Sequence, residues 1–405
     1  MFLSFRGGVL DNKEIRSDFP LAQKVIYLDS AATSLTPISV VEGVAEYYRE
    51  YNANTGRGVH HLSQIAGAKY LAARRKIATL IGGKEEEIIF TQSATYAINT
   101  VAQGISLQPG DHIVTTNLEH HSNFLPWLRL RERGVEVTVV KASPTGHLEL
   151  DDFQGAIDER TKLVAVAHVS NVLGTITPIS DLSALCHEKG ALLLVDGAQS
   201  VPHMPVDVER LGCDFLCFSG HKMLGPTGTG VLWVRENLIS QLSPLVVGGG
   251  AIEDVSMDEY LLAPGYTGFE AGTPNIAGVI GLGRAVDYLN ALSMEWVEEH
   301  EARLTEQLLS GLEHIERVKI VGEKGARGRI GVVPFVVEGM HPHDVALLLD
   351  EAAGILVRSG HQCALPLMKE LGLKDGVVRV SLYLYSTQEE VEILLITLNK
   401  ALSRT

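Results

Sequence analysis

Seven short apolar runs alternate with helical stretches between about residues 85 and 235, and this alternation constrains the fold more than any other feature of the sequence. The runs are EEIIFT (86–91), DHIVTT (111–116), EVTVVKA (136–142), KLVAVAHV (162–169), ALLLVDGA (191–198), DFLCFSG (214–220) and GVLWV (230–234). Several are apolar at successive positions, which strands tolerate only when both faces of the sheet are covered. The pattern predicts an α/β fold in which helices bury a mostly parallel sheet.

Polar residues follow several of these runs. Ligands of such sheets bind beyond the carboxyl ends of the strands, so these residues are the first candidates for a functional site. They are Thr91 to Ser93, Glu119 to His121, Asn171, Asp196 to Gln199, and Ser219 to Lys222.

The pattern of predicted helices and strands changes after about residue 284. A long helical stretch from Arg284 to Arg317 precedes short strands and a further helix from Pro342 to Ala353. We expect an N-terminal segment (1–22) that packs on a small domain, a large domain (23–283), and that small C-terminal α+β domain (284–405).

The last strand and helix of this small domain are predicted from local patterns. In VVRVSLYLY (377–385), alternation places one set of side chains on an apolar face and points Arg379 away from it. The apolar set is Val378, Val380, Leu382 and Leu384, and the opposite set is Arg379, Ser381 and Tyr383. The final helix is expected to open with a capping box from Ser386 to Glu389.

Composition excludes several classes of protein. The 405 residues suffice for two or three domains, and a net charge of −15 disfavours nucleic acid as a partner. No apolar run reaches the roughly 18 residues of a membrane helix, and Arg6, Asp11 and Lys13 interrupt the start of the chain. Four scattered cysteines without a CxxC pair suggest neither a disulfide framework nor zinc. We expect a cytoplasmic protein with reduced thiols that binds no membrane and no metal.

Asp196 and Lys222 end consecutive strand runs. Taken singly, Asp196 is explained equally well by a loop cap or by a functional role, and Lys222 is better explained as a solvated lysine. A carboxylate at the end of a buried strand, however, needs a cationic or donor partner. Pyridoxal phosphate (PLP) requires this pair, because a carboxylate keeps its pyridine nitrogen protonated and a lysine amine binds its aldehyde. The two residues together predict a PLP site.

A PLP site also needs a cradle for the phosphate. FTQSATYAIN places Ser93, Ala94 and Thr95 between a strand and a helix, where backbone amides and the helix dipole favour an anion. Ser219 and His221, on either side of Gly220, are further donors. The alternative is that Ser93 to Thr95 form a simple helix N-cap.

Four sequence motifs contain or accompany the residues of this predicted site: DGAQS (196–200), SGHKMLGPTGTG (219–230), FEAGTPN (269–275) and VRSGHQCALPLM (357–368). With them the chain resembles the class V aminotransferase family, specifically the SUF-type (group II) cysteine desulfurases and selenocysteine lyases. The likeness runs from YLDSAATSLTP (27–37) to the last helix. It implies the PLP-dependent transferase fold type I, with a large, mostly parallel seven-stranded sheet domain and a smaller C-terminal α+β domain.

The resemblance also implies roles for individual residues. The implied cofactor-binding residues are Ala94, Thr95, His120, Asn171, Asp196, Gln199, Ser219, His221, Lys222 and, from a second subunit, Thr273. Lys222 would carry PLP, Asp196 would meet the pyridine nitrogen, and His120 would stack on the ring and help to move protons. Gln199 and Asn171 would approach the phenolic oxygen. The phosphate would be held by Ala94, Thr95, Ser219 and His221, and Thr273 implies a homodimer.

The substrate side of the site is implied in the same way. Arg379 would clamp the substrate carboxylate, for which a planar guanidinium is well suited, with Ala31 and Asn171 beside it. Cys363 would attack the sulfur of PLP-bound cysteine, giving a persulfide and alanine. The alternative for Cys363 is a buried packing thiol, which its polar neighbours argue against. We assign no chemistry to Cys186, Cys213 or Cys217.

Three positions depart from the family pattern. Gly56 occupies a position where the family commonly has a histidine that acts across the dimer. How the chain would control its active site without this histidine is left open. Gln362 replaces a common second histidine, and Ala94 replaces a common threonine, whose backbone amide remains available.

The expected activity is a PLP-dependent cysteine desulfurase that mobilises sulfur from L-cysteine for iron–sulfur cluster or related biosynthesis. The same machinery is compatible with lyase activity on L-selenocysteine, and a sulfur-acceptor or scaffold protein is an expected partner. One alternative is another class V enzyme, an aminotransferase or a kynureninase-like lyase, which would leave Cys363 idle. Another is a non-catalytic dimeric scaffold.

Overall fold

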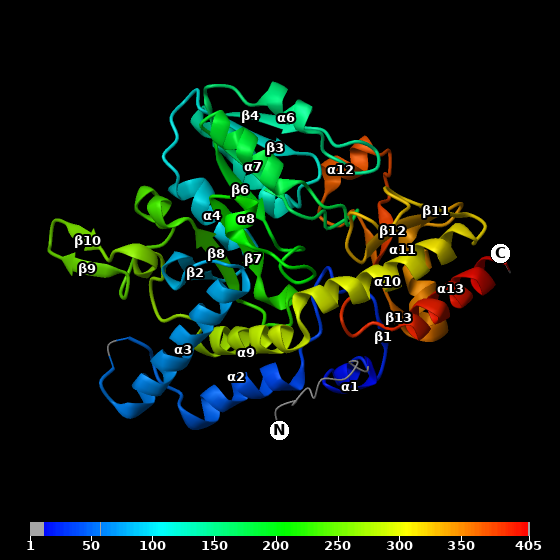
Figure 1. Ribbon diagram of the computed structural model, residues 1–405, viewed down its shortest axis with the longest axis horizontal. Helices are drawn as coiled ribbons and strands as arrows, with labels where there is room; N and C mark the ends of the chain where they lie inside the picture. Colours follow the sequence, from blue (N-terminus) through cyan, green and yellow to red (C-terminus); the bar gives the residue numbers. More distant parts are fainter. Residues whose placement is uncertain (1–11, 57, 404–405) are drawn as a thin grey trace.

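A seven-stranded sheet forms the centre of the larger lobe of the computed structural model, which describes residues 12–56 and 58–403 (Figure 1). Its strands are β2 (Ile88–Thr91), β3 (His112–Thr116), β4 (Glu136–Val140), β5 (Thr161–Ala167), β6 (Leu192–Asp196), β7 (Phe215–Ser219) and β8 (Gly230–Val234). Their order is β2-β8-β7-β6-β5-β3-β4, and only β8 runs antiparallel to its neighbours. The seven predicted runs are these strands, so the predicted α/β fold class is confirmed.

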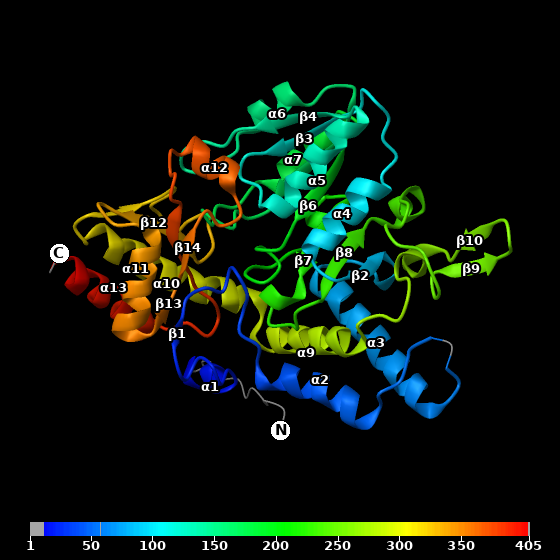
Figure 2. The same ribbon diagram turned by 180° about the vertical axis from the view of Figure 1, so that it is seen from behind.

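Helices cover both faces of this sheet. In β6, Leu193 and Val195 belong to one hydrophobic cluster, whereas Leu194 belongs to the cluster on the opposite face. Helix α7 (Ile179–Glu188) contributes to the first cluster and α4 (Ala94–Gly104) to the second. Figures 1 and 2 show these two helices on opposite sides of the sheet. The strands are apolar at successive positions because both of their faces are removed from water.

Further helices surround the larger lobe. They are α2 (Ile38–Glu50), α3 (His61–Leu80), α5 (Leu125–Arg129), α6 (Leu150–Ala156), α8 (Val208–Leu211) and α9 (Ile276–Leu292). The short 3-10 helices are η1 (Glu85–Glu87), η2 (His121–Asn123), η3 (Leu130–Arg133), η4 (Gly220–Lys222), η5 (Glu236–Gln241) and η6 (Gly265–Phe269). Helices α3 and α9 approach closely at Gly283, where a Cβ atom would lie 2.7 Å from that of Ala73.

The smaller lobe contains a four-stranded antiparallel sheet in the order β11-β12-β15-β14. The strands are β11 (Val318–Ile320), β12 (Val332–Val337), β14 (Arg358–Gly360) and β15 (Val377–Ser381). Its helices are α10 (Met294–Glu313), α11 (Pro342–Ala353), α12 (Leu365–Glu370) and α13 (Gln388–Leu402). Strand β1 (Ile26–Tyr27) joins this lobe by pairing with β13 (Ile355–Leu356), whereas β9 (Ile252–Val255) and β10 (Tyr260–Leu262) form a hairpin that projects from the larger lobe (Figure 1).

The predicted helical stretch from Arg284 to Arg317 consists of two helices, which meet at Ser293, and it ends at Glu313. Helix α9 begins earlier, at Ile276, and ends at Leu292. Ser293 then adopts a φ of 68°, which interrupts the helix, and its side chain accepts a hydrogen bond from the Trp296 amide to start α10. An N-cap serine therefore separates the two helices.

The predicted capping box is displaced by one residue. Thr387 caps α13 and pairs reciprocally with Glu390, whereas the Ser386 hydroxyl accepts from the Tyr383 amide. The prediction for Leu384 is also wrong. Strand β15 ends at Ser381, so strand alternation no longer applies at Leu384, which packs in the cluster of the larger lobe. Arg379 lies away from the apolar layer, as predicted, and its side chain lines the pocket described below.

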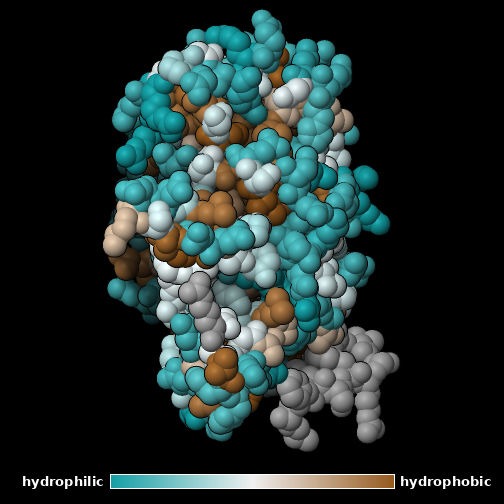
Figure 3. Space-filling view, turned by 90° about the vertical axis from the view of Figure 1, so that its left-hand side faces the viewer, coloured by the Kyte–Doolittle hydropathy of each residue, from teal (hydrophilic) through white to brown (hydrophobic). Residues whose placement is uncertain are grey.

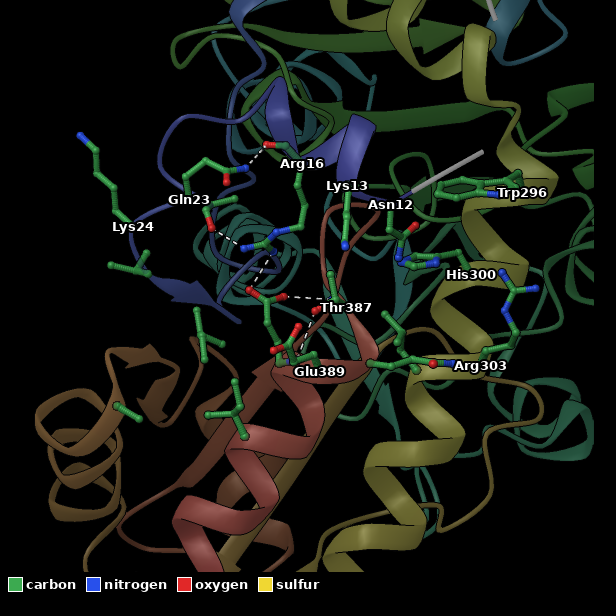
Figure 4. Close-up of a pocket in the computed structure, with 18 residues that line it drawn as sticks. Asn12, Lys13, Arg16, Gln23, Lys24, Trp296, His300, Arg303, Thr387 and Glu389 are labelled. Carbon is green, nitrogen blue, oxygen red and sulfur yellow. Dashed lines mark hydrogen bonds and ion pairs between the residues drawn. The ribbon is translucent and has the colours of Figure 1, made fainter. Parts of the chain in front are cut away.

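The described N-terminal residues contact the C-terminal helix. Arg16 of α1 (Asn12–Ser17) pairs with Glu390 at 2.8 Å and donates to the Tyr385 carbonyl. Figure 4 shows Arg16 and Thr387 beside an open cleft of about 1240 Å³, with Trp296 and Arg303 of α10 across it. The proposed division at residues 22 and 283 stays a prediction, and residues 1–11 of the predicted N-terminal segment lie outside the described residues. Within the described chain, no helix has the length and apolar character needed to span a membrane.

Candidate active site

A pocket of about 220 Å³ lies at the carboxyl ends of the central strands and brings together every predicted site residue except Thr273. Its predicted lining residues are Ala31, Ala94, Thr95, His120, Asn171, Asp196, Gln199, Ser219, His221, Lys222, Cys363 and Arg379. Both lobes contribute, since Cys363 and Arg379 come from the smaller one. Sequence reasoning did not assign Ala32, Ser122, Ala167, Val169 and Ala198 to this lining.

Asp196 is the last residue of β6 and is buried. Its Oδ1 atom accepts a hydrogen bond of 2.9 Å from the Ala198 amide. Burial raises the pKa of Asp196, whereas the Ala198 amide and the charge of Lys222 lower it. The loop-cap interpretation therefore holds for one carboxylate oxygen, and the same carboxyl group faces the pocket.

Lys222 ends η4, directly after β7, and is only partly exposed. Burial lowers its pKa to about 8, and the negative charge of Asp196 acts in the opposite direction. Among the residues that the structure describes, no carboxylate forms an ion pair with it. A lysine with this pKa has a substantial neutral fraction near pH 8, which is the state that attacks a carbonyl carbon.

His120 precedes η2 and faces the pocket with a neutral ring. Burial lowers its pKa to about 3, and the charge of Lys222 lowers it further. Its Nδ1 atom accepts from the Ser122 amide at 3.1 Å, which leaves the ring proton on Nε2. The adjoining Glu119 is buried and accepts from the Thr116 hydroxyl at 2.6 Å and from the Ala167 amide at 3.1 Å. Glu119 thereby ties the turn that carries His120 to β3 and β5.

Hydroxyl and amide donors gather at the N-terminus of α4. The Ala94 amide donates to the Ser219 hydroxyl at 2.8 Å, and the hydroxyls of Thr95 and Ser122 lie 2.7 Å apart. Ser93 is the N-cap of α4 and accepts from the Tyr96 amide, so the N-cap interpretation is correct for this residue. The other donors are arranged at the positive end of a helix dipole, which suits an anion.

Two amide side chains occupy the pocket wall. Gln199 donates to the Ala31 carbonyl at 2.8 Å, and its buried Oε1 atom has no hydrogen-bond partner in the described chain. Asn171 donates to the Gln362 carbonyl at 2.8 Å. A buried amide oxygen without a partner beside a cavity indicates a place for a ligand with a donor group.

Arg379 is buried on β15, and sequence reasoning missed its main partner. Its Nη1 atom donates to the Asn171 carbonyl at 2.9 Å and its Nη2 atom to Asp29 at 3.0 Å. Burial lowers the pKa of Arg379, and Asp29 opposes this shift. Arg358 also approaches Asp29, at 3.7 Å. The only signal in the sequence was the acidic residue within YLDSAATSLTP.

Cys363 is exposed, whereas the other three cysteines are buried. This excludes the packing-thiol alternative for Cys363. Burial raises the pKa of Cys186 and of Cys213 to about 12 and raises that of Cys217 as well. Because the thiolate is the nucleophile, these three thiols are unsuited to nucleophilic attack.

Thr273 lies in a second cleft, of about 830 Å³, which it shares with Gly56. Neither residue lines the pocket that contains Lys222. The two positions whose family counterparts are expected to act across a dimer therefore lie together in a cleft separate from that pocket.

The residues of the main pocket fit PLP chemically. A buried carboxylate suits the pyridine nitrogen, a lysine amine of lowered pKa suits the aldehyde, and the donors at the α4 N-terminus suit the phosphate. The unpartnered oxygen of Gln199 and the guanidinium of Arg379 add polar groups for the remainder of the ligand.

Comparisons with known proteins identify the family of the chain. Residues 26–394 match the family model "Aminotransferase class-V". The chain is 47% identical over 385 residues to a probable cysteine desulfurase of Methanothermobacter thermautotrophicus, covering 94% of this chain and 96% of that one. It is 39% identical over 407 residues to the cysteine desulfurase of Haloferax volcanii, covering 95% of each.

The similar solved structures are also cysteine desulfurases. The apo cysteine desulfurase of Thermococcus onnurineus has a TM-score of 0.95 and 44% identity, covering 99% of this chain and 100% of that one. The Escherichia coli cysteine desulfurase CsdA has a TM-score of 0.91 and 34% identity, covering 98% and 100%. The chain therefore belongs to the class V aminotransferase family and, within it, to the cysteine desulfurases, which are PLP-dependent enzymes of fold type I.

Proposed function

We propose that this enzyme converts L-cysteine to L-alanine and receives the sulfur on Cys363 as a persulfide. The observation that carries the proposal is that Cys363, the one exposed cysteine within the described part of the chain, lines the same pocket as Lys222, Asp196 and Arg379. An aminotransferase or a kynureninase-like lyase would need the lysine and the aspartate but not the cysteine. A non-catalytic scaffold would need none of them.

The pocket residues have distinct roles in this proposal. PLP, when bound, supplies an electron sink for the α-carbon of the substrate. Lys222 holds the cofactor through its amine, Asp196 keeps the pyridine nitrogen protonated, and His120 covers the ring. Gln199 and Asn171 serve the phenolic oxygen. The proposed phosphate donors are Ala94, Thr95, Ser219 and His221, of which the His221 ring contacts Thr33 at 3.2 Å.

The substrate is held from the other side of the pocket. Arg379 binds its carboxylate, with Ala31 and Asn171 alongside. Asn171 and Asp29 accept from two nitrogens of the guanidinium, which fixes the plane of the fork before substrate arrives. A preorganised guanidinium loses little freedom when it binds a carboxylate.

Sulfur transfer needs a nucleophile, and Cys363 supplies it. The Cys363 sulfur forms a bond to the substrate sulfur while the substrate C–S bond breaks. The electron pair of that bond stays with carbon, which takes up a proton and becomes the methyl group of alanine. Nζ of Lys222 and Nε2 of His120 are the proton-carrying atoms in the pocket that are suited to this step.

The outer sulfur of the persulfide must be passed on, which returns Cys363 to its thiol form. Exposure of Cys363 supports transfer to a sulfur-acceptor protein, with iron–sulfur cluster or related biosynthesis as the destination. Selenocysteine fits the same pocket as a second substrate, because selenium differs little from sulfur in size. An exposed reactive thiol is maintained best in a reducing compartment, which supports a cytoplasmic location.

We also propose that the enzyme is a homodimer in which Thr273 contributes to the phosphate site of the second subunit. The cleft around Thr273 and Gly56 lies apart from the chain's own pocket. Exposed apolar side chains lie near it, among them Val59, which is 90% exposed. Figure 3 shows separate hydrophobic groups among mainly hydrophilic side chains on the side of the molecule that carries the β9–β10 hairpin.

The test combines product analysis with protein mass spectrometry. After incubation of PLP-loaded enzyme with L-cysteine, we expect alanine in solution and one additional sulfur atom on the peptide that contains Cys363. A reductant should remove this sulfur. Placement of the sulfur on Cys186, Cys213 or Cys217, or alanine formation without any persulfide, would contradict the proposal. Buried Cys217 provides the internal control, because its peptide should stay unmodified.

A further inference from the structure

The nucleophilic cysteine lies on a short loop that joins the smaller lobe to the pocket. We define the Cys363 loop as residues 361–364, between β14 and α12. Strand β14 before the loop belongs to the sheet of the smaller lobe, whereas Leu367 and Met368 of α12 after it pack in the cluster that includes the core of the larger lobe. The reach of the loop into the pocket therefore depends on contacts with the larger lobe. The placement of the Cys363 sulfur therefore depends on what holds this loop across the junction between the lobes.

The backbone of the loop has an uncommon conformation. Gln362 has a φ of 56° and Cys363 a φ of 55°, so two consecutive residues other than glycine are left-handed. Side chains with a Cβ atom disfavour this region, and such residues persist only where surrounding contacts fix them. The Cys363 loop consequently needs anchors outside itself.

His121 provides two of these anchors. Its backbone amide donates to the Cys363 carbonyl at 2.7 Å, and its Nε2 atom accepts from the Leu365 amide at 3.1 Å. The two contacts bracket the nucleophile, one at residue 363 and one at residue 365. A third anchor, the Asn171 amide on the Gln362 carbonyl, also comes from the larger lobe.

His120 and His121 divide their tasks. His120 lines the pocket, whereas His121 does not and is engaged with the Cys363 loop and the start of α12. Because Nε2 of His121 accepts a hydrogen bond, this atom carries no proton. Burial lowers the pKa of His121, and the charge of His361 lowers it further, so the accepting form of the ring is maintained near neutral pH.

We propose that His121 is a positioning residue that fixes the Cys363 loop over the pocket through its ring contact with the Leu365 amide. The inference rests on the proposed role of Cys363 in taking sulfur. His121 contacts no substrate or reacting atom, so its loss should lower kcat for alanine formation while the apparent KM for cysteine, set by Arg379, changes little.

The test compares two amides of different reach at this position. In His121→Gln, Oε1 can occupy the place of Nε2 and accept from Leu365. In His121→Asn, the shorter side chain cannot reach it. His314→Ala, at an exposed histidine on another surface, is the matched control. Amide exchange of the peptide spanning 361–368 is followed by mass spectrometry in the PLP-loaded enzyme, together with steady-state alanine formation and visible absorbance.

We expect faster exchange in this peptide, about fivefold to tenfold, and a similar fall in kcat for His121→Asn, since one hydrogen bond to the loop is lost. His121→Gln and His314→Ala should resemble the wild type, and all variants should retain the cofactor absorbance. Equal behaviour of the Asn and Gln variants would overturn the proposal. If Cys363 does not carry sulfur, the wild type fails the persulfide assay, whereas the exchange difference still reports on the His121 contact.

Discussion

Arg379 donates from Nη2 to the Oδ1 atom of Asp29 across 3.0 Å, and the two residues are separated by 350 positions in the chain. The guanidinium is almost fully buried, with 2% of its side chain exposed, whereas 20% of the Asp29 side chain is exposed. Asp29 follows β1, which pairs with the smaller lobe, so the N-terminal part of the chain orients the residue proposed to bind the substrate.

Replacing Arg379 tests the proposed carboxylate clamp. Arg379→Ala should raise the KM for cysteine by about 30-fold or more, because an unmatched charge in a closed site costs about 2 kcal/mol at least. Arg379→Lys should be intermediate, since it keeps the charge and loses the fork. Steady-state kinetics provide the measurement, and Arg49→Ala, at an exposed arginine, is the control. An unchanged KM would place the carboxylate elsewhere.

Replacing Lys222 tests the cofactor linkage. Lys222→Ala should abolish the visible absorbance of lysine-bound PLP, because no other lysine lines the pocket among the residues that the structure describes. Lys141→Ala, at an exposed lysine, should keep the spectrum of the wild type. Retention of the band in the Lys222 variant would show that the cofactor is attached through another residue.

The lowered pKa of Lys222 predicts the pH dependence of PLP loading. Only the neutral amine attacks the aldehyde, and burial lowers the pKa of this amine from 10.5 to about 8. The rate of PLP incorporation into cofactor-free enzyme should therefore rise up to about pH 8 and then level off. A solvated lysine would give a rate that rises up to about pH 10.4. Absorbance growth after PLP addition, measured between pH 6.5 and 9.5, distinguishes the two courses.

Asp196 should control both affinity for PLP and turnover. Asp196→Ala is expected to weaken PLP binding and to lower kcat by about 100-fold, because the pyridine nitrogen loses the carboxylate that keeps it protonated. Asp196→Glu keeps the charge and is the matched comparison. Fluorescence titration with PLP and alanine assays provide the two readouts. Turnover near that of the wild type in Asp196→Ala would mean that the ring nitrogen has a different partner.

Cys363 should be required for sulfur transfer but not for cofactor binding. Cys363→Ser should retain PLP absorbance and fail to form alanine from cysteine, since a hydroxyl is a poor acceptor of sulfur. Selenium leaves carbon more readily, so activity on selenocysteine should fall less. Cys186→Ser, at a buried thiol outside the pocket, controls for loss of a cysteine as such. Desulfuration by Cys363→Ser at the rate of the wild type would favour the lyase or aminotransferase alternative.

Local patterns were sufficient for the architecture of the larger lobe and for much of the pocket. Each strand can be recognised from the apolar residues within its own short run, and the residues that end parallel strands meet at one edge of the sheet. Asp196 and Lys222 could therefore be paired before their contacts were known. The family motifs extended this to Cys363 and Arg379, and the structure places all four in one pocket.

Other features depended on the tertiary structure, because they are contacts between residues far apart in the chain. The periodicity of a helix or a strand relates only residues that are close in sequence. The contact of Arg379 with Asp29 and that of His121 with the Leu365 amide each link segments far apart in the chain. Local patterns did not reveal the break between two helices at Ser293, and they placed the N-cap of the last helix at Ser386 instead of Thr387. A single residue decides where a helix begins, and Ser386 and Thr387 are adjacent residues that both suit an N-cap. The sequence by itself determined which groups the site contains, whereas the meeting of the two lobes decided how Arg379 and Cys363 are held within it.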